Sequence, residues 1–220
     1  KIGVSLCKAL QSIILGIYSA LLSPPCPGYT VRNVLDNMLK LVTNKTTPFS
    51  GHECAINILG VITRQRASDC GSMLSEIITT LLKTVKSSGS GEVTWKVLSL
   101  QAIDHIVIGA RNRIADMHPE IVKMVTKIMG VPERSAAVRQ QCAILIESIA
   151  RFGGGHSTVG VEALLGAISK GLEDEVVPVQ ASCARATASI YYEAMVSLQQ
   201  ATQATRASAN RGGSNQPEGG

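Results

Sequence analysis

The chain has 220 residues and a formal net charge of +5, and 45% of its residues are hydrophobic while only 3% are aromatic. A chain of this length can hold one large domain or a row of about four helix pairs. The scarcity of aromatic rings argues against an aromatic ligand pocket and against a surface that stacks nucleic-acid bases. We therefore expect a core of aliphatic side chains in thin, regular layers.

The first predicted element is an apolar helix within residues 1–22. Its most apolar part, residues 13–22, is too short to cross a bilayer, and Lys8 interrupts a longer apolar run. The flanking residues do not match a signal peptide. We interpret residues 1–22 as the second helix of a truncated preceding repeat in a longer protein, because so apolar an end requires another layer to cover it.

Paired helical stripes follow between residues 23 and 203. The first stripe of each pair is expected within residues 31–42, 77–85, 121–128 and 161–168. The second stripes end at four isoleucines that are 44, 43 and 41 residues apart, namely Ile62, Ile106, Ile149 and Ile190. Apolar residues in the stripes recur at steps of three and four, which places them on one face of a helix.

The last two second stripes, 135–149 and 175–190, align most closely. Cys142 and Cys183 occupy equivalent places in them, where a small apolar residue is wanted. Segments with glycine or proline separate the stripes, and no sustained alternation of apolar and polar residues predicts a strand. The sequence therefore predicts an all-α fold with a repeat of a little over 40 residues, which is typical of stacked helix pairs.

The pair Val138-Arg139, at the head of one second stripe, resembles HEAT repeats. The acidic run 172–175 before Pro178-Val179 is similar, although Gln180 stands where arginine is expected. The resemblance covers residues 1 to 200 and implies a HEAT/armadillo-like, right-handed α-α superhelix, with about four helix pairs plus an N-terminal half repeat. It also implies a non-catalytic protein-binding scaffold or adaptor module of a larger protein.

Residues 204–220 differ in composition from the repeats. They contain no large apolar side chain and are rich in glycine, serine and asparagine. Such a segment cannot bury enough apolar surface to offset the entropy lost on ordering. We predict a disordered C-terminal tail, with the last helix fraying after Leu198.

The cysteines show no metal-binding pattern, since the chain has no CxxC motif and no Cys/His cluster with zinc spacing. We expect neither a metal nor a cofactor. Cys26 and Cys70 are expected in loops, where a thiol can be reactive. Reduced thiols are typical of a cytoplasmic or nuclear protein.

Catalytic patterns are also lacking. The four histidines are scattered and are expected to be structural or surface residues: His52, His105, His118 and His156. The segment 153–158 is rich in glycine, but no strand precedes it and no GK[ST] follows, so it does not fit a phosphate-binding loop. We predict that the protein is not an enzyme and has no small-molecule substrate.

Basic residues recur after each second stripe, and we call the set the basic edge: Arg64, Arg66, Arg111, Arg113 and Arg151. Equivalent turns of stacked repeats line up along one edge, whereas the turns within the pairs are weakly acidic. The basic edge is a candidate docking site for an acidic protein partner. The other interpretation is that these arginines only compensate the dipoles of helix C-termini.

Two alternative functions remain. Trp95-Lys96 is expected in a turn within a pair. It is similar there to the tubulin-binding TOG domains, which place tryptophan and basic residues in such turns. The alternative interpretation is that Trp95 packs between units. The net positive charge permits a nucleic-acid-associated solenoid, but the chain lacks a lysine or arginine run with interleaved aromatic residues. We therefore regard nucleic acid as the less suitable partner.

Overall fold

The computed structural model describes residues 30–87, 93–131, 135–153 and 159–212, with a few scattered positions before residue 17. Regular secondary structure in these ranges is helical throughout, which confirms the prediction of an all-α chain. None of the helices in this part of the chain combines the length and hydrophobicity that a bilayer crossing requires. The helix predicted within residues 1–22 lies largely outside the described residues.

The helices form pairs, and we call the members of each pair the first and the second helix. The first helices are α2 (Val31–Thr43), α4 (Met73–Ser87), α6 (His118–Gly130) and α8 (Val161–Ile168). The second helices are α3 (Phe49–Cys70), α5 (Val93–Ala110), α7 (Ala136–Phe152) and α9 (Val177–Gly212). Two 3₁₀ helices, η1 (Arg111–Met117) and η2 (Ser169–Glu173), follow α5 and α8. Each predicted stripe lies on one of these helices.

Local sequence sets several helix ends. The side chain of Thr30 accepts a hydrogen bond from the backbone N–H of Asn33 at 3.2 Å and so caps α2. Helix α6 begins with a proline and an acidic residue in its first turn. Gly71 has a φ of 50°, a left-handed conformation that glycine adopts without strain, and it separates α3 from α4.

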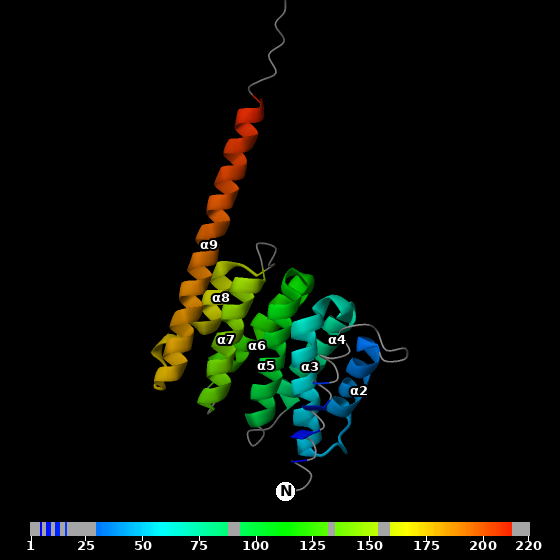
Figure 1. Cartoon of the computed structure of the whole chain (residues 1–220). Helices are drawn as coiled ribbons and strands as arrows, with labels where there is room; N and C mark the ends of the chain where they lie inside the picture. Colours follow the sequence, from blue (N-terminus) through cyan, green and yellow to red (C-terminus); the bar gives the residue numbers. More distant parts are fainter. Residues whose placement is uncertain are drawn as a thin grey trace, which may run out of the picture.

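The second helices pack in chain order, with α3 against α5, α5 against α7, and α7 against α9. Among the first helices, α2 contacts α4 and α6 contacts α8. Figure 1 shows the pairs side by side across the molecule in the same order. The four repeat isoleucines are each exposed by 2% or less: Ile62, Ile106, Ile149 and Ile190. The residues that define the repeat in the sequence are therefore core residues in every pair.

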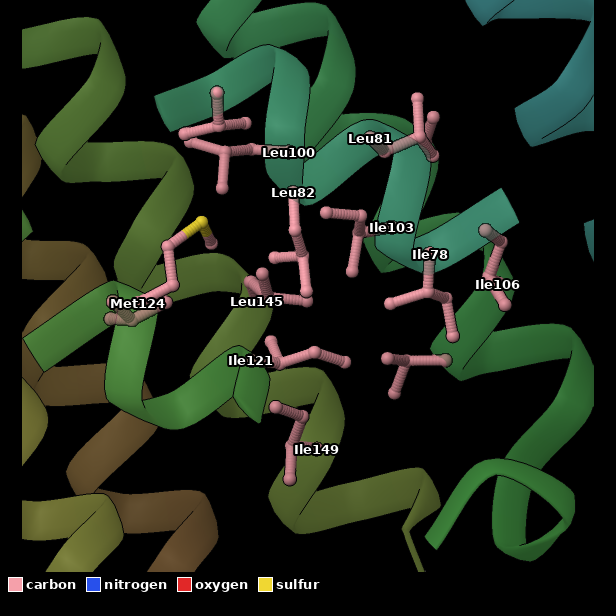
Figure 2. Close-up of a cluster of buried hydrophobic side chains, with 14 of the residues drawn as sticks. Ile78, Leu81, Leu82, Leu100, Ile103, Ile106, Ile121, Met124, Leu145 and Ile149 are labelled. Carbon is pink, nitrogen blue, oxygen red and sulfur yellow. The ribbon is translucent and has the colours of Figure 1, made fainter. Parts of the chain in front are cut away.

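Aliphatic side chains from neighbouring pairs share one core. In Figure 2, side chains of α4 and α5 meet those of α6 and α7 in a continuous cluster. Small residues occupy the fully buried position seven residues before each repeat isoleucine, namely Ala55, Ser99, Cys142 and Cys183. In the last pair, a Cβ on Gly171 of η2 would clash with the sulfur of Cys183, so the chain approaches this position closely.

Two glycines allow α3 and α5 to pack closely against each other. A Cβ on Gly109 would lie 2.6 Å from the carbonyl oxygens of Thr63 and Arg64, and a Cβ on Gly60 would lie 3.1 Å from the Cα of Ala102. Both contacts join residues that are about one repeat apart. The helices α3 and α5 therefore run in the same direction, with a register set by the repeat.

The C-terminal end of the chain differs from the sequence prediction. Helix α9 continues to Gly212, through the first part of the segment 204–220 for which we predicted disorder. Residues 201–206 are exposed, so tertiary packing does not hold them. Alanine, glutamine and arginine have good helix propensity, and no glycine or proline interrupts this stretch before Gly212. Residues 213–220 lie outside the described part of the chain.

Candidate protein-binding edge

The arginines of the basic edge lie toward the C-terminal ends of three successive second helices. Arg64 and Arg66 are in α3, Arg111 and Arg113 are in η1, and Arg151 is in the last turn of α7. The sequence analysis placed all five in turns, and this detail is corrected. Helix α3 continues to Cys70 because no glycine or proline lies between Gly60 and Gly71, although the backbone at Arg66 departs from helical geometry (φ −131°, ψ 35°).

Arg66 is engaged within its own helix. Its Nε donates a hydrogen bond to Oδ2 of Asp69 at 2.6 Å. This hydrogen bond lowers the pKa of Asp69, and the charge of Arg113 lowers it further. Arg113 belongs to the next helix pair, so arginines of two neighbouring pairs come together around one carboxylate.

The charge of Arg64 affects the pKa of a buried carboxyl group, that of Asp104. Asp104 on α5 is only 8% exposed, and one of its oxygens, Oδ1, has no hydrogen-bond partner in the described part of the chain. Burial raises the pKa of Asp104 to about 6, and Glu147 adds to the increase. A hydrogen bond with Ser148 and the charge of Arg64 oppose it. Residues of α3, α5 and α7 therefore share one electrostatic network.

Glu147 extends the network to the last helix pair. Its carboxylate accepts a hydrogen bond from Nε of Arg185 on α9 at 3.3 Å and lies 3.5 Å from Nη1 of Arg151. The Glu147 side chain is only 14% exposed, whereas both arginines are more than half exposed. Arg151 is thus partly neutralised by an acid on its own helix.

Sequence reasoning missed the acids of this edge, which are Asp69, Asp104 and Glu147. A usable signal exists for two of them, because Asp104 and Glu147 each stand two residues before a repeat isoleucine. The edge therefore carries mixed charge. Among the described residues, Arg64, Arg111 and Arg113 are the exposed arginines of the edge that take part in no ion pair.

Arg111 has an unusual backbone. Its φ of 52° lies in the left-handed region, and it is the one residue other than glycine with positive φ in the described part of the chain. It follows directly after α5, a place where glycine commonly ends a helix. An arginine in this conformation is strained, and such strain is concentrated at functional positions.

One acid of the opposite edge, Asp174, joins two neighbouring helix pairs. Asp174 accepts two hydrogen bonds from Arg139 on α7, at 2.6 Å from Nε and 2.9 Å from Nη2, and a third from the backbone N–H of Val176. The hydrogen bond from Arg139 lowers the pKa of Asp174 most. Both side chains are largely buried, so this bidentate pair fixes α7 to the start of α9.

Trp95 lies between helix pairs. Its ring stacks on His52 of α3, with centroids 4.7 Å apart, and on Phe49 at 5.3 Å. Nε2 of His52 lies 3.1 Å from the carbonyl oxygen of Asn44 and can donate to it. These contacts are those expected if Trp95 packs between units.

The prediction that Cys70 is a loop residue with a reactive thiol is wrong. Cys70 is the last residue of α3 and is 3% exposed, and burial raises the pKa of its thiol to about 11. A thiol with so high a pKa is protonated and inert near neutral pH. Cys26, the other cysteine expected in a loop, lies outside the described residues.

Histidines in the described part do not form a polar centre. His118 is fully buried at the start of α6, and burial lowers the pKa values of His118 and His105. His156 lies outside the described residues. Within the described ranges, no three His, Cys, Asp or Glu residues are grouped so that they could hold a metal ion.

Comparisons of this chain with protein-family models, with curated proteins and with solved structures find no match. The contacts themselves therefore define the class of protein: an all-α chain in which helix pairs pack against their neighbours. Its candidate site is the basic edge.

Proposed function

We propose that the chain is a non-catalytic protein-binding scaffold of the HEAT-like solenoid type. The observation that carries this proposal is the consecutive packing of second helices, α3 on α5 on α7 on α9, with the repeat isoleucine of each buried. In such a stack each layer covers the next, and the long edges remain free for partners.

The contact between Arg139 and Asp174 supports the HEAT-like assignment. These residues belong to the two segments on which the sequence resemblance rests, and they meet across neighbouring helix pairs. A buried bidentate pair fixes the relative orientation of two layers more strictly than apolar packing alone. A scaffold requires such fixed orientation, because its edges must hold one shape to present a binding surface.

We place the partner contact on Arg64, Arg111 and Arg113, for an acidic protein. These three arginines are exposed and come from two neighbouring helix pairs. Arg66 and Arg151 contribute less to the proposed contact, because Asp69 and Glu147 partly neutralise them. The strained backbone of Arg111 is a further reason to place the contact here.

Affinity capture with a neutralised edge tests the proposal. The test variant carries Arg64→Gln, Arg111→Gln and Arg113→Gln. The control variant loses the same charge on exposed lysines of the first helices, through Lys83→Gln, Lys123→Gln and Lys127→Gln. We expect proteins that the unaltered chain and the control both capture to be lost from the test variant. Equal recovery by all three would remove the basic edge from the proposal.

The tubulin-binding alternative has a separate test. The stacking of Trp95 on His52 and Phe49 favours a packing role for this ring over a partner contact. Co-pelleting with microtubules, with Trp95→Ala as the comparison, distinguishes the two functions. Binding that is lost in this variant while its thermal unfolding is unchanged would favour the tubulin-binding alternative.

A further inference from the structure

Helix α9 carries a second apolar stripe that nothing in the described part of the chain covers. We call it the α9 seam, and it consists of Val177, Ala181, Ala184, Ala188, Tyr191, Met195, Leu198 and Thr202. The steps between them are of three or four residues, which is the spacing of a coiled-coil contact face. All eight residues are exposed, and the larger apolar side chains are 55% to 69% exposed.

The α9 seam is separate from the face that α9 buries. Val179, Cys183, Ala186 and Ile190 are buried where α9 packs on the rest of the protein. The second half of the seam lies on the part of α9 that projects beyond the other helices in Figure 1. A long, isolated helix that exposes a stripe of this size lacks the packing that stabilises helices in proteins.

The repeat register shows what kind of contact the seam makes. On α7, Gln140 and Glu147 face α9, where they contact Ser182 and Arg185. One repeat of 41 residues later, their equivalents on α9 are Ala181 and Ala188, which belong to the seam. The seam is therefore the α9 copy of the surface that another helix covers on α7, and it is suited to a helix.

The seam is complementary to itself in one orientation. In an antiparallel pair of α9 helices, Ala188 meets Tyr191 of a second copy, Ala184 meets Met195, and Ala181 meets Leu198. Val177 then meets Thr202, so all four pairings share a single register. Three successive layers thus place a large side chain on a small one, which fills space evenly along the pair.

A parallel pair does not fit in this way. It would place alanine on alanine in three layers and tyrosine, methionine and leucine on themselves in the next layers, so the helix separation would change along the pair. The antiparallel register also avoids opposing like charges, since Arg185 faces Tyr192 and Gln199 of the second copy. An arginine beside a tyrosine ring is a favourable contact.

We propose that two copies of this chain associate through the α9 seam as an antiparallel, two-fold symmetric pair. The projecting half of each α9 covers the exposed end layer of the other copy. This association is independent of the basic edge, because the seam residues and the edge arginines do not overlap.

Sedimentation equilibrium of the 220-residue chain and two single variants tests the pairing. Ala184→Asp and Met195→Lys each place an unpaired charge in a seam layer, and each is expected to weaken dimerisation by about tenfold or more. A mixture of the two variants places the introduced carboxylate of one chain against the introduced ammonium group of the other and should restore a dimer. The control, Gln200→Lys on the outer face of α9, should dimerise as the unaltered chain does.

Cysteine cross-linking distinguishes the orientations. Oxidation of mixed Ala184→Cys and Met195→Cys chains should give a heterodimeric product, whereas Ala184→Cys alone should not cross-link. Because every altered residue is exposed, far-ultraviolet circular dichroism should show unchanged helix content. A chain that is monomeric at all concentrations, a dimer insensitive to both seam charges, or efficient self-linking of the Ala184→Cys chain would each overturn the proposal.

Discussion

Replacing Asp104 by asparagine should make the stability of the protein depend differently on pH. Asp104 is buried between α3 and α7, and its pKa is raised to about 6 from an ordinary value of 3.8. Asparagine has nearly the same shape and retains an oxygen that can accept the hydrogen bond from Ser148. The substitution therefore removes the titration of this group with little change in packing.

The direction of the pKa shift determines whether Asp104 makes the protein more or less stable as pH rises. Between the unfolded and folded pKa values, the folded state holds the Asp104 proton while the unfolded state has lost it, so stability falls as pH rises through this window. The full pKa shift corresponds to a change of about 3 kcal/mol in the free energy of unfolding. About 2 kcal/mol of this change falls between about pH 4.5 and about pH 7.5. As pH rises over that interval, the free energy of unfolding of Asp104→Asn should therefore increase by about 2 kcal/mol relative to that of the unaltered chain.

Urea unfolding of both proteins at several pH values measures this difference, and changes common to both cancel. Asp69→Asn is a matched control with the opposite sign, because Arg66 lowers the pKa of Asp69. Stability that Asp69 contributes is present above its unfolded pKa and is lost as pH falls, so the control should be weakened mainly at neutral pH. A stability difference for Asp104→Asn that does not change with pH would refute the reasoning.

Four further substitutions test the packing, with Gly166→Ala as the control for Gly109→Ala. Gly109→Ala should lower stability by about 1–3 kcal/mol, because its Cβ would lie 2.6 Å from two carbonyl oxygens of α3. Gly166→Ala, at an exposed position of α8 with no atom within 4 Å of the added Cβ, should instead raise stability by about 0.5–1 kcal/mol. Ser99→Ala should raise stability by about 1 kcal/mol, because the buried hydroxyl has no hydrogen-bond partner in the described part of the chain. Arg139→Ala should lower stability by about 3 kcal/mol, because it leaves Asp174 largely buried without its cation. Thermal or urea unfolding measures each change, and a stable Gly109→Ala variant would show that α3 and α5 are not in close contact.

The sequence predicted the parts of this structure that depend on periodicity. The repeat isoleucines and the small residues seven positions before them are buried, because each second helix meets its neighbours at equivalent places. The arginines of the basic edge were located by the same reasoning, since arginine recurs near the ends of the first three second helices and this is visible without coordinates. That this edge binds a partner stays a prediction.

Contacts between residues far apart in sequence could not be predicted in this way. The burial of Asp104 beside Arg64, and the pairing of Arg139 with Asp174, depend on how two helix pairs are rotated against each other. The continuation of α9 to Gly212 was missed for another reason: a composition typical of disorder also contains the alanine and glutamine that favour a local helix.

The account rests on the claim that each helix pair is held mainly by its neighbours in the row. Hydrogen exchange of the Ile190→Ala variant, measured by mass spectrometry, tests this most directly, because Ile190 is 2% exposed in the last pair and its truncation should cost about 3 kcal/mol there. Protection should fall in α8, η2 and α9 and remain unchanged in α2 and α3. An equal loss of protection in every helix would contradict the account.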